Sequence, residues 1–93
     1  MNSAIFLDRD GVINYSIVRE NKPYAPLNLS ELKIIPEIKP VIDFFKRRQF
    51  KLLVVTNQPD VARGKVKIDE VEKINVSIQS QLSIDEIFTC YHD

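Results

Sequence analysis

Three short segments of the chain have the apolar character of buried β-strands. Residues 4–7 (AIFL) form the first, and residues 51–55 (KLLVV) form a continuous apolar run of strand length. Runs of this kind are typical of strands that are buried on both faces of a parallel sheet. Residues 84–89 (IDEIFT) are compatible with a third short strand. The pattern therefore predicts three strands that lie far apart in the sequence.

Two segments between these strands have the apolar spacing of amphipathic helices. In residues 37–49 the apolar positions are Ile38, Val41, Ile42 and Phe45. In residues 67–82 they are Ile68, Val71, Ile74 and Ile78. Pro40 falls in the first turn of the first helix, where its missing N–H is tolerated. Residues 14–36 contain three prolines and show no period, so we expect a long loop or flap there, with a turn of structure at 29–32.

The predicted order of elements is strand, loop, helix, strand, helix, strand. Strands that alternate with helices pair in parallel and are joined by right-handed crossovers. A length of 93 residues is enough for one domain at most. We therefore predict an α/β fold with a parallel sheet, formed by a single domain over residues 1–93.

Composition and charge argue against several classes of function. The 13 basic and 13 acidic residues cancel, so no basic surface for nucleic acid or for an anionic membrane is indicated. No apolar run approaches the ~20 residues that span a bilayer, and no signal peptide is visible. The single cysteine, Cys90, fits a reducing compartment, so we predict a cytoplasmic protein.

Polar residues follow each predicted strand at the point where the strand ends. Asp8 and Asp10 follow the first strand, the Thr-Asn-Gln stretch 56–58 follows the second, and Cys90 and His92 follow the third. In open α/β sheets, ligands bind outside the carboxyl ends of the strands. The topology therefore predicts that all three polar groups meet at one edge of the sheet.

Asp8 and Asp10 have the chemistry of a paired-carboxylate site. Two close carboxylates repel each other, and Mg²⁺ would relieve that repulsion because it prefers oxygen ligands. One carboxylate could then attack a substrate while the other transfers protons. Gly11 allows a sharp turn, and Thr56 and Asn57 offer donors to phosphate oxygens. The same acids are equally compatible with a solvated loop or a helix cap.

A family resemblance favours the catalytic interpretation. Residues 6–12 (FLDRDGV) resemble motif I of the haloacid dehalogenase superfamily of phosphohydrolases. Residues 54–64 (VVTNQPDVARG) and 22–26 (KPYAP) resemble its branch of heptose-bisphosphate and histidinol-phosphate phosphatases. Residues 90–92 (CYH) are similar to the start of a zinc loop in that branch. The resemblance covers essentially the whole chain but only the first half or so of a family protein.

The resemblance implies roles for particular residues. Asp8 would be the nucleophile, forming an aspartyl-phosphate, and a Mg²⁺ ligand. Asp10 would protonate the leaving alcohol and then activate water, while its main-chain carbonyl also binds Mg²⁺. Thr56 and Asn57 would hold the phosphoryl group. Arg63 would meet a second phosphate or a sugar hydroxyl, although a solvated arginine fits its position as well.

The same resemblance sets the expectations for what surrounds the site. Arg9 is expected to point away from the site and to have a structural role. The fold would be a partial, Rossmann-like, three-layer form of the family fold, lacking the C-terminal strands. The family's motif III lysine and motif IV acid would lie beyond Asp93. Cys90 and His92 alone do not complete a tetrahedral zinc site, so an absent metal is the alternative to zinc binding there.

Two functions therefore remain open. The first is a Mg²⁺-dependent phosphomonoesterase acting on a small phosphorylated sugar of the heptose-bisphosphate kind, in carbohydrate metabolism. The second is a non-catalytic truncated fragment that keeps the core and binds Mg²⁺ or phosphate weakly. We also expect self-association or a partner half, with activity of the isolated chain near background. A receiver domain is disfavoured because the acids follow the first strand.

Overall fold

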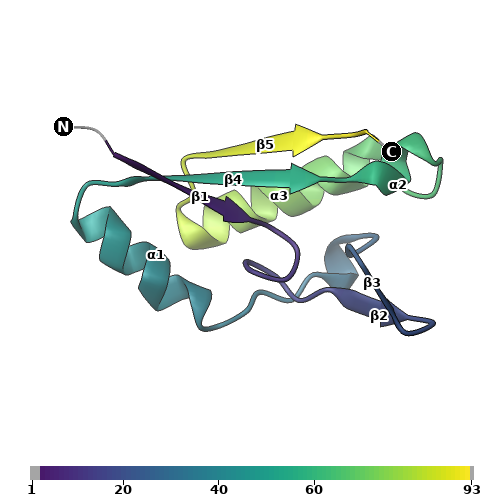
Figure 1. Cartoon of the computed structure of the whole chain (residues 1–93), viewed down its shortest axis with the longest axis horizontal. Coiled ribbons are helices and arrows are strands. Elements are labelled where there is room, and N and C mark those ends of the chain that lie inside the picture. Colours follow the sequence, from purple (N-terminus) through teal and green to yellow (C-terminus); the bar gives the residue numbers. More distant parts are fainter. Residues whose placement is uncertain (1–2, 93) are drawn as a thin grey trace.

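A parallel three-stranded sheet forms the centre of the molecule. The computed structural model describes residues 3–92 (Figure 1). The strands are β1 (Ala4–Asp8), β4 (Lys51–Asn57) and β5 (Glu86–Cys90), in the order β1-β4-β5. Both pairings are parallel, as the alternation of elements predicts. The α/β fold with a parallel sheet is therefore confirmed.

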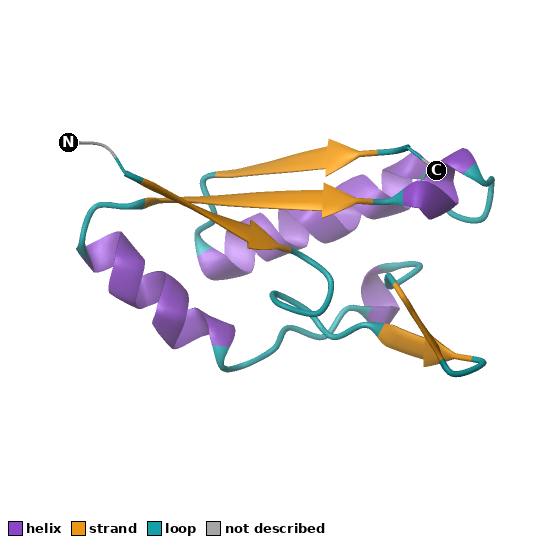
Figure 2. Ribbon diagram, viewed as in Figure 1, coloured by secondary structure: helices purple, strands orange, loops and turns teal. Residues whose placement is uncertain are grey.

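Two helices connect these strands. Helix α1 (Ile38–Arg47) joins β1 to β4, and α3 (Ile68–Leu82) joins β4 to β5 after a single helical turn, α2 (Pro59–Ala62). Because both crossovers advance across the sheet in the same direction and share one hand, α1 and α3 lie on the same face (Figure 2). The described part of the chain therefore has two layers, one of strands and one of helices, and residues 3–92 do not form the third layer of the expected family fold.

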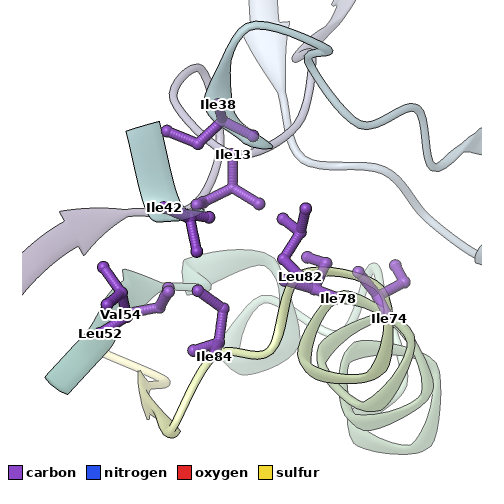
Figure 3. Close-up of a cluster of buried hydrophobic side chains, with 9 residues drawn as sticks. All are labelled: Ile13, Ile38, Ile42, Leu52, Val54, Ile74, Ile78, Leu82 and Ile84. Atoms are coloured by element: carbon purple, nitrogen blue, oxygen red, sulfur yellow. The ribbon is translucent and has the colours of Figure 1, made fainter. Parts of the chain in front are cut away.

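The hydrophobic core fills the space between the sheet and these helices (Figure 3). Its members come from the loop after β1, from both helices, from β4 and from the start of the β5 segment. They are Ile13, Ile38, Ile42, Leu52, Val54, Ile74, Ile78, Leu82 and Ile84. Burial of such side chains contributes about 1.5–3 kcal/mol each, so this layer supplies most of the stabilisation that fixes the sheet edge.

The other face of the sheet is open in the described residues. Phe6 is 64% exposed, Val55 43% and Phe88 49%, one from each strand. The expectation that the KLLVV strand is buried on both faces is therefore wrong here. The side chains of β4 alternate between buried and exposed, because α1 and α3 cover only one face of the sheet.

The helix predictions are confirmed in position and need correction at two residues. Val41 and Ile68 were expected on the apolar faces but are 42% and 44% exposed. Both helices still bury a stripe at the remaining predicted positions. None of the helices that the structure describes is long and apolar enough to cross a membrane.

The segment expected to be a loop contains a β-hairpin. Strands β2 (Ile17–Arg19) and β3 (Lys22–Tyr24) pair antiparallel. Glu20 and Asn21 join them with φ of 51° and 63°, the two left-handed residues of a type I′ turn. The expected turn of structure is confirmed as the 3-10 helix η1 (Leu29–Glu31).

An ion pair ties the hairpin to η1. Nη2 of Arg19 donates to both carboxylate oxygens of Glu31, at 2.9 and 3.0 Å. The N–H of Leu27 donates to the same carboxylate at 2.7 Å. That main-chain hydrogen bond and the Arg19 guanidinium lower the pKa of Glu31 despite partial desolvation. The hairpin is thereby held beside the carboxyl ends of the strands.

Candidate active site

A tight turn after β1 places the two predicted acids. Asp8 is the last residue of β1. The carbonyl of Arg9 then accepts from the N–H groups of Val12, Ile13 and Asn14, at 3.2, 2.8 and 3.2 Å. Gly11 within this turn has a φ of 91°, a conformation that strains any other residue. The turn brings Asp10 back over the end of the sheet.

The end of β4 lies directly beside this turn. Asp8 is in register with Val55, so Thr56 and Asn57 extend just past it. Asp8, Asp10, Thr56 and Asn57 together line a small open pocket of about 190 Å³. The predicted convergence of the first two polar groups at one sheet edge is therefore what the structure shows.

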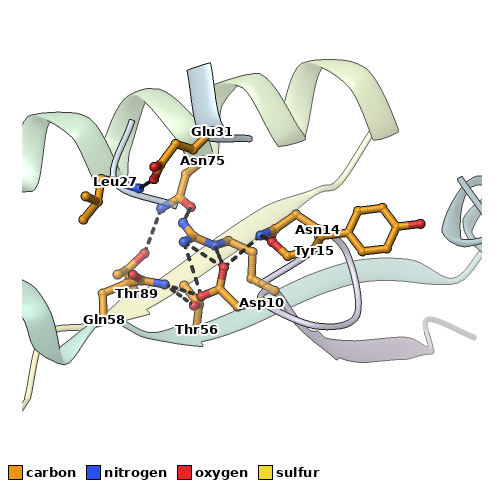
Figure 4. A network of polar contacts seen from close by, with 10 residues as sticks. Asp10, Asn14, Tyr15, Leu27, Glu31, Thr56, Gln58, Asn75 and Thr89 are labelled. Carbon is orange, nitrogen blue, oxygen red and sulfur yellow. Dashed lines mark hydrogen bonds and ion pairs between the residues drawn. The ribbon is translucent and has the colours of Figure 1, made fainter. Parts of the chain in front are cut away.

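The two carboxylates of this pocket have different surroundings. The Asp8 side chain is exposed and makes no hydrogen bond or ion pair with the residues that the structure describes. Asp10, in contrast, accepts from three side chains (Figure 4). Asn14 Nδ2 donates to its Oδ1 at 3.0 Å, and Gln58 Nε2 donates to its Oδ2 at 2.8 Å. Asp8 is therefore exposed without a partner among the described residues, and Asp10 is held in one orientation.

Arg9 is the third partner of Asp10, and its position corrects a prediction. The guanidinium is turned toward the Asp10 carboxylate, with Nε at 3.2 Å and Nη2 at 3.1 Å from Oδ1. The expectation that Arg9 points away from the site is therefore wrong. The side chain is buried, 1% exposed, so its charge is neutralised chiefly by Asp10.

The polar network continues from Arg9 into α3 and β5. Arg9 Nη1 donates to Oδ1 of Asn75 at 2.8 Å, and Asn75 Nδ2 donates to Oγ1 of Thr89 at 3.0 Å. Asn75 was not predicted. The signal for it is an asparagine between Ile74 and Ile78 on the buried stripe of α3, since a buried amide needs partners.

Gln58 and Asn14 were also missed as site residues. Gln58 bonds both Asp10 and the Thr56 hydroxyl and is 4% exposed. Asn14 is fully buried beneath the turn. Both follow predicted site residues closely in the sequence, but their type alone does not distinguish a ligand contact from a structural one.

A second pocket of about 340 Å³ adjoins the first. Asp10 and Asn57 line both pockets. Pro23 and Tyr24 of the hairpin, the adjoining Ala25, and Arg63 also line this second pocket. Arg63 also pairs with Asp60 at 3.4 Å. The hairpin therefore forms a wall of a cavity that opens from the two acids.

The oxygen atoms at this edge of the sheet are suitable ligands for a hard cation. The exposed Asp8 carboxylate offers oxygen, and the Asp10 carbonyl is not used by the hydrogen bonds that hold the turn. Mg²⁺ is bound in this way, by one or two protein oxygens with water and substrate completing the shell. Within residues 3–92, no three His, Cys, Asp or Glu side chains are grouped as a metal site.

Cys90 is the last residue of β5, and His92 follows it at the same edge of the sheet. The Cys90 carbonyl accepts from the Gln58 N–H at 2.7 Å, so Cys90 lies beside the end of β4. Its side chain is half-buried and its thiol is free. No third ligand joins the pair among the described residues. Zinc binding by Cys90 and His92 stays a prediction.

Comparison with known proteins gives a consistent set of relatives. The chain is 33% identical over 99 residues to a D-glycero-beta-D-manno-heptose-1,7-bisphosphate 7-phosphatase of Haemophilus influenzae, covering 99% of this chain and 50% of that protein. A protein of the same name from Helicobacter pylori is 30% identical, with 98% and 53% covered. No family model matches the chain.

A solved structure shows the same fold. The D,D-heptose 1,7-bisphosphate phosphatase of B. bronchiseptica, complexed with magnesium and phosphate, superposes with a TM-score of 0.81 at 25% identity. The match covers 98% of this chain and 51% of that one. The chain thus spans about half the length of the relatives it matches. It is homologous to heptose-bisphosphate phosphatases and has the fold of the haloacid dehalogenase-like phosphatases.

Proposed function

We propose that the chain supplies the phosphoryl-accepting part of a Mg²⁺-dependent phosphomonoesterase, with Asp8 as nucleophile. The observation that supports this most directly is the contrast between the two acids of one pocket. Asp8 is exposed and unbonded, whereas Asp10 is fixed by Arg9, Asn14 and Gln58. A free carboxylate beside an oriented one is the arrangement that nucleophilic and proton-transfer roles require.

The first step transfers the phosphoryl group to the protein. A carboxylate oxygen of Asp8 bonds to phosphorus, and the phosphorus–oxygen bond of the ester breaks. The leaving alkoxide takes a proton from the Asp10 carboxyl, so the products are an aspartyl-phosphate and a neutral alcohol. Thr56 and Asn57, which line the same pocket, hold the phosphoryl oxygens.

The second step returns Asp8 to its starting state. Asp10, now a carboxylate, takes a proton from water, and the water oxygen bonds to phosphorus. The bond from phosphorus to the Asp8 oxygen breaks, which releases inorganic phosphate and restores the protonated Asp10. The three contacts that orient Asp10 keep its carboxyl near one position through both steps.

Mg²⁺ would be held by the Asp8 carboxylate and the Asp10 main-chain carbonyl. When bound, it neutralises the phosphoryl oxygens and the charge of the adjacent acids. Arg63 lines the adjoining cavity, where it would meet a second phosphate or a sugar hydroxyl of the substrate. We therefore propose a phosphorylated sugar, with heptose bisphosphate first among the candidates because of the relatives.

The test combines turnover with a mimic of the phosphorylated intermediate. The full chain is assayed with Mg²⁺ on an aryl phosphate and on heptose bisphosphate. Binding of beryllium trifluoride, which mimics an aspartyl-phosphate, is measured by titration calorimetry. We expect Mg²⁺-dependent beryllium trifluoride binding in the wild type and none in Asp8→Asn. Binding that survives Asp8→Asn, or its absence from the wild type, would contradict the proposal.

A further inference from the structure

Gln58 lies between Asp10 and Thr56, two of the groups that the proposed reaction uses. Its Nε2 lies 2.8 Å from Oδ2 of Asp10 and 2.8 Å from Oγ1 of Thr56 (Figure 4). The residue is 4% exposed, so water does not compete for these contacts. Its side chain makes no capping bond to α2, although it stands at the N-cap of that turn. The Gln58 amide is therefore committed to the site.

The chemistry of a carboxylate fixes which way this amide faces. Between the two proposed steps Asp10 is a carboxylate, which only accepts hydrogen bonds, so the Gln58 group that lies 2.8 Å from its Oδ2 is the NH₂ and not the carbonyl oxygen. An amide NH₂ has two hydrogens. One is donated to Asp10 and the other to Thr56, which saturates the group.

This arrangement assigns a direction to the Thr56 hydroxyl. A hydroxyl has one hydrogen and two acceptor positions. Because Oγ1 of Thr56 accepts from Gln58, its hydrogen is left for another acceptor, and no acceptor among residues 3–92 takes it. Thr56 lines the pocket that holds Asp8, so an incoming phosphoryl oxygen is an available acceptor.

We propose that Gln58 is a positioning residue, which turns the Thr56 hydroxyl into an obligate donor toward the phosphoryl group and aligns Asp10 at the same time. The proposal rests on the proposed phosphoryl-transfer function of this pocket. Asp10 would otherwise compete for the Thr56 hydrogen, because a carboxylate is the stronger acceptor. By donating to both groups, Gln58 removes that competition while Asp10 is a carboxylate, in the aspartyl-phosphate state that beryllium trifluoride mimics.

The proposal predicts that Gln58 acts through the Thr56 hydroxyl. Gln58→Met keeps the length of the side chain and removes both donors. We expect it to weaken Mg²⁺-dependent beryllium trifluoride binding about tenfold, the effect of one weakened hydrogen bond to an anion. The effect should persist in a Thr56→Ser background, which keeps a hydroxyl. It should largely vanish in Thr56→Val, which has none.

Controls separate this role from folding and from the proposed function. Gln81→Met makes the same replacement on the exposed side of α3, where Gln81 bonds only Ser77, and should leave binding unchanged. Unfolding curves show whether Gln58→Met remains folded. Equal losses from Gln58→Met in the threonine and valine backgrounds, or no loss in either, would overturn the positioning role while Asp8-dependent binding stands. Wild-type binding that does not depend on Asp8 would overturn the proposed function and this inference together.

Discussion

The two ends of β4 use acidic side chains in opposite ways. At the amino end, the Asp85 carboxylate accepts from the Leu52 N–H at 2.7 Å and lies within 3.4 Å of the Lys46 ammonium. At the carboxyl end, Asp10 is bound by three side chains, but Asp8 beside it has no partner among the described residues. Hydrogen bonding to carboxylates fixes the fold at one end, whereas at the other it leaves one acid without a partner among the described residues.

The amino end is a closed set of contacts. Leu52 is fully buried, and its N–H has the Asp85 side chain as acceptor, while the Asp85 N–H donates to the Leu52 carbonyl at 2.9 Å. Every group in this exchange has a partner. The main-chain bond from Leu52 and the Lys46 charge lower the pKa of Asp85 against desolvation. Such a site has no capacity left for a ligand, which distinguishes it from the pocket at the other end.

The largest difference between the two ends should appear in activity. Asp8→Asn removes the proposed nucleophile, and in a version that spans the full length of its relatives we expect turnover to fall by at least about a thousandfold, since loss of one member of a covalent catalytic unit has cost roughly 10⁴–10⁶ elsewhere. Its stability should be unchanged because Asp8 is exposed and unbonded. Asp85→Asn is the matched change at the amino end and should leave turnover intact. Equal turnover in Asp8→Asn and Asp85→Asn would contradict the assignment of the nucleophile to the carboxyl end of β4.

Asp10→Ala should affect both properties at once. It removes the proposed proton-transfer group, worth about 10²–10⁴ in rate, and leaves the buried Arg9 without its carboxylate. Breaking such a pair costs about 3 kcal/mol of unfolding free energy, measured by urea unfolding. Asp43→Ala breaks an exposed pair with Lys39 on α1 and should cost at most about 0.5 kcal/mol. A similar cost in both variants would mean that Arg9 finds another partner.

The parts of the fold that the sequence predicted follow from local periodicity. The three parallel strands and both long helices have strong apolar patterns, and the structure places them within a few residues of the predicted ranges. The exposed Val55 could not be foreseen, because an apolar run reports the character of a strand and not how many faces are covered. The number of covered faces is set by where the helices pack.

The hairpin was missed because its turn has unusual residues. A type I′ turn favours Asn-Gly or Asp-Gly, and here the first position is Glu20 with a φ of 51°. Pro23 inside β3 also argues against a strand, but this hairpin has only two strands and Pro23 needs no donor on its outer side. The Arg19–Glu31 ion pair, twelve residues apart, fixes the hairpin and is not visible as a local pattern.

The candidate site was predictable in part for a similar reason. The position of Asp8, Asp10 and Thr56 at strand ends follows from topology alone. The partners of Asp10 could not be ranked, because an arginine between two acids gives no indication of which way it turns. The contact from Arg9 to Asn75 joins residues 66 positions apart and depends on the packing of α3 against the sheet.

Removing the acceptor at the amino end should destabilise the protein without changing the reaction. Asp85→Ala leaves the buried Leu52 N–H without its side-chain acceptor, which costs about 1–3 kcal/mol. Asp85→Asn keeps an oxygen acceptor and should cost less. Urea unfolding measures both, and turnover per folded molecule should match the wild type. A rate that falls with Asp85→Ala would show that the two ends are coupled.

The smallest expected effect is a pH dependence that belongs to the amino end and to the hairpin. The pKa of Asp85 in the folded chain is lowered from its ordinary value of 3.8, and that of Glu31 is lowered from 4.5. The unfolded chain therefore takes up these protons first as the pH falls. The stability that each group contributes is fully present above its ordinary value and is lost as the pH falls through the lower folded value. Because Asp85 and Glu31 are both partly exposed, each loss should be smaller than the cost of Asp85→Ala.

Urea unfolding at neutral pH and near pH 3 tests this pH dependence. Asp85→Asn should lose less stability between the two conditions than the wild type, since an amide does not titrate there. An equal loss would show that Asp85 is not a source of the acid sensitivity.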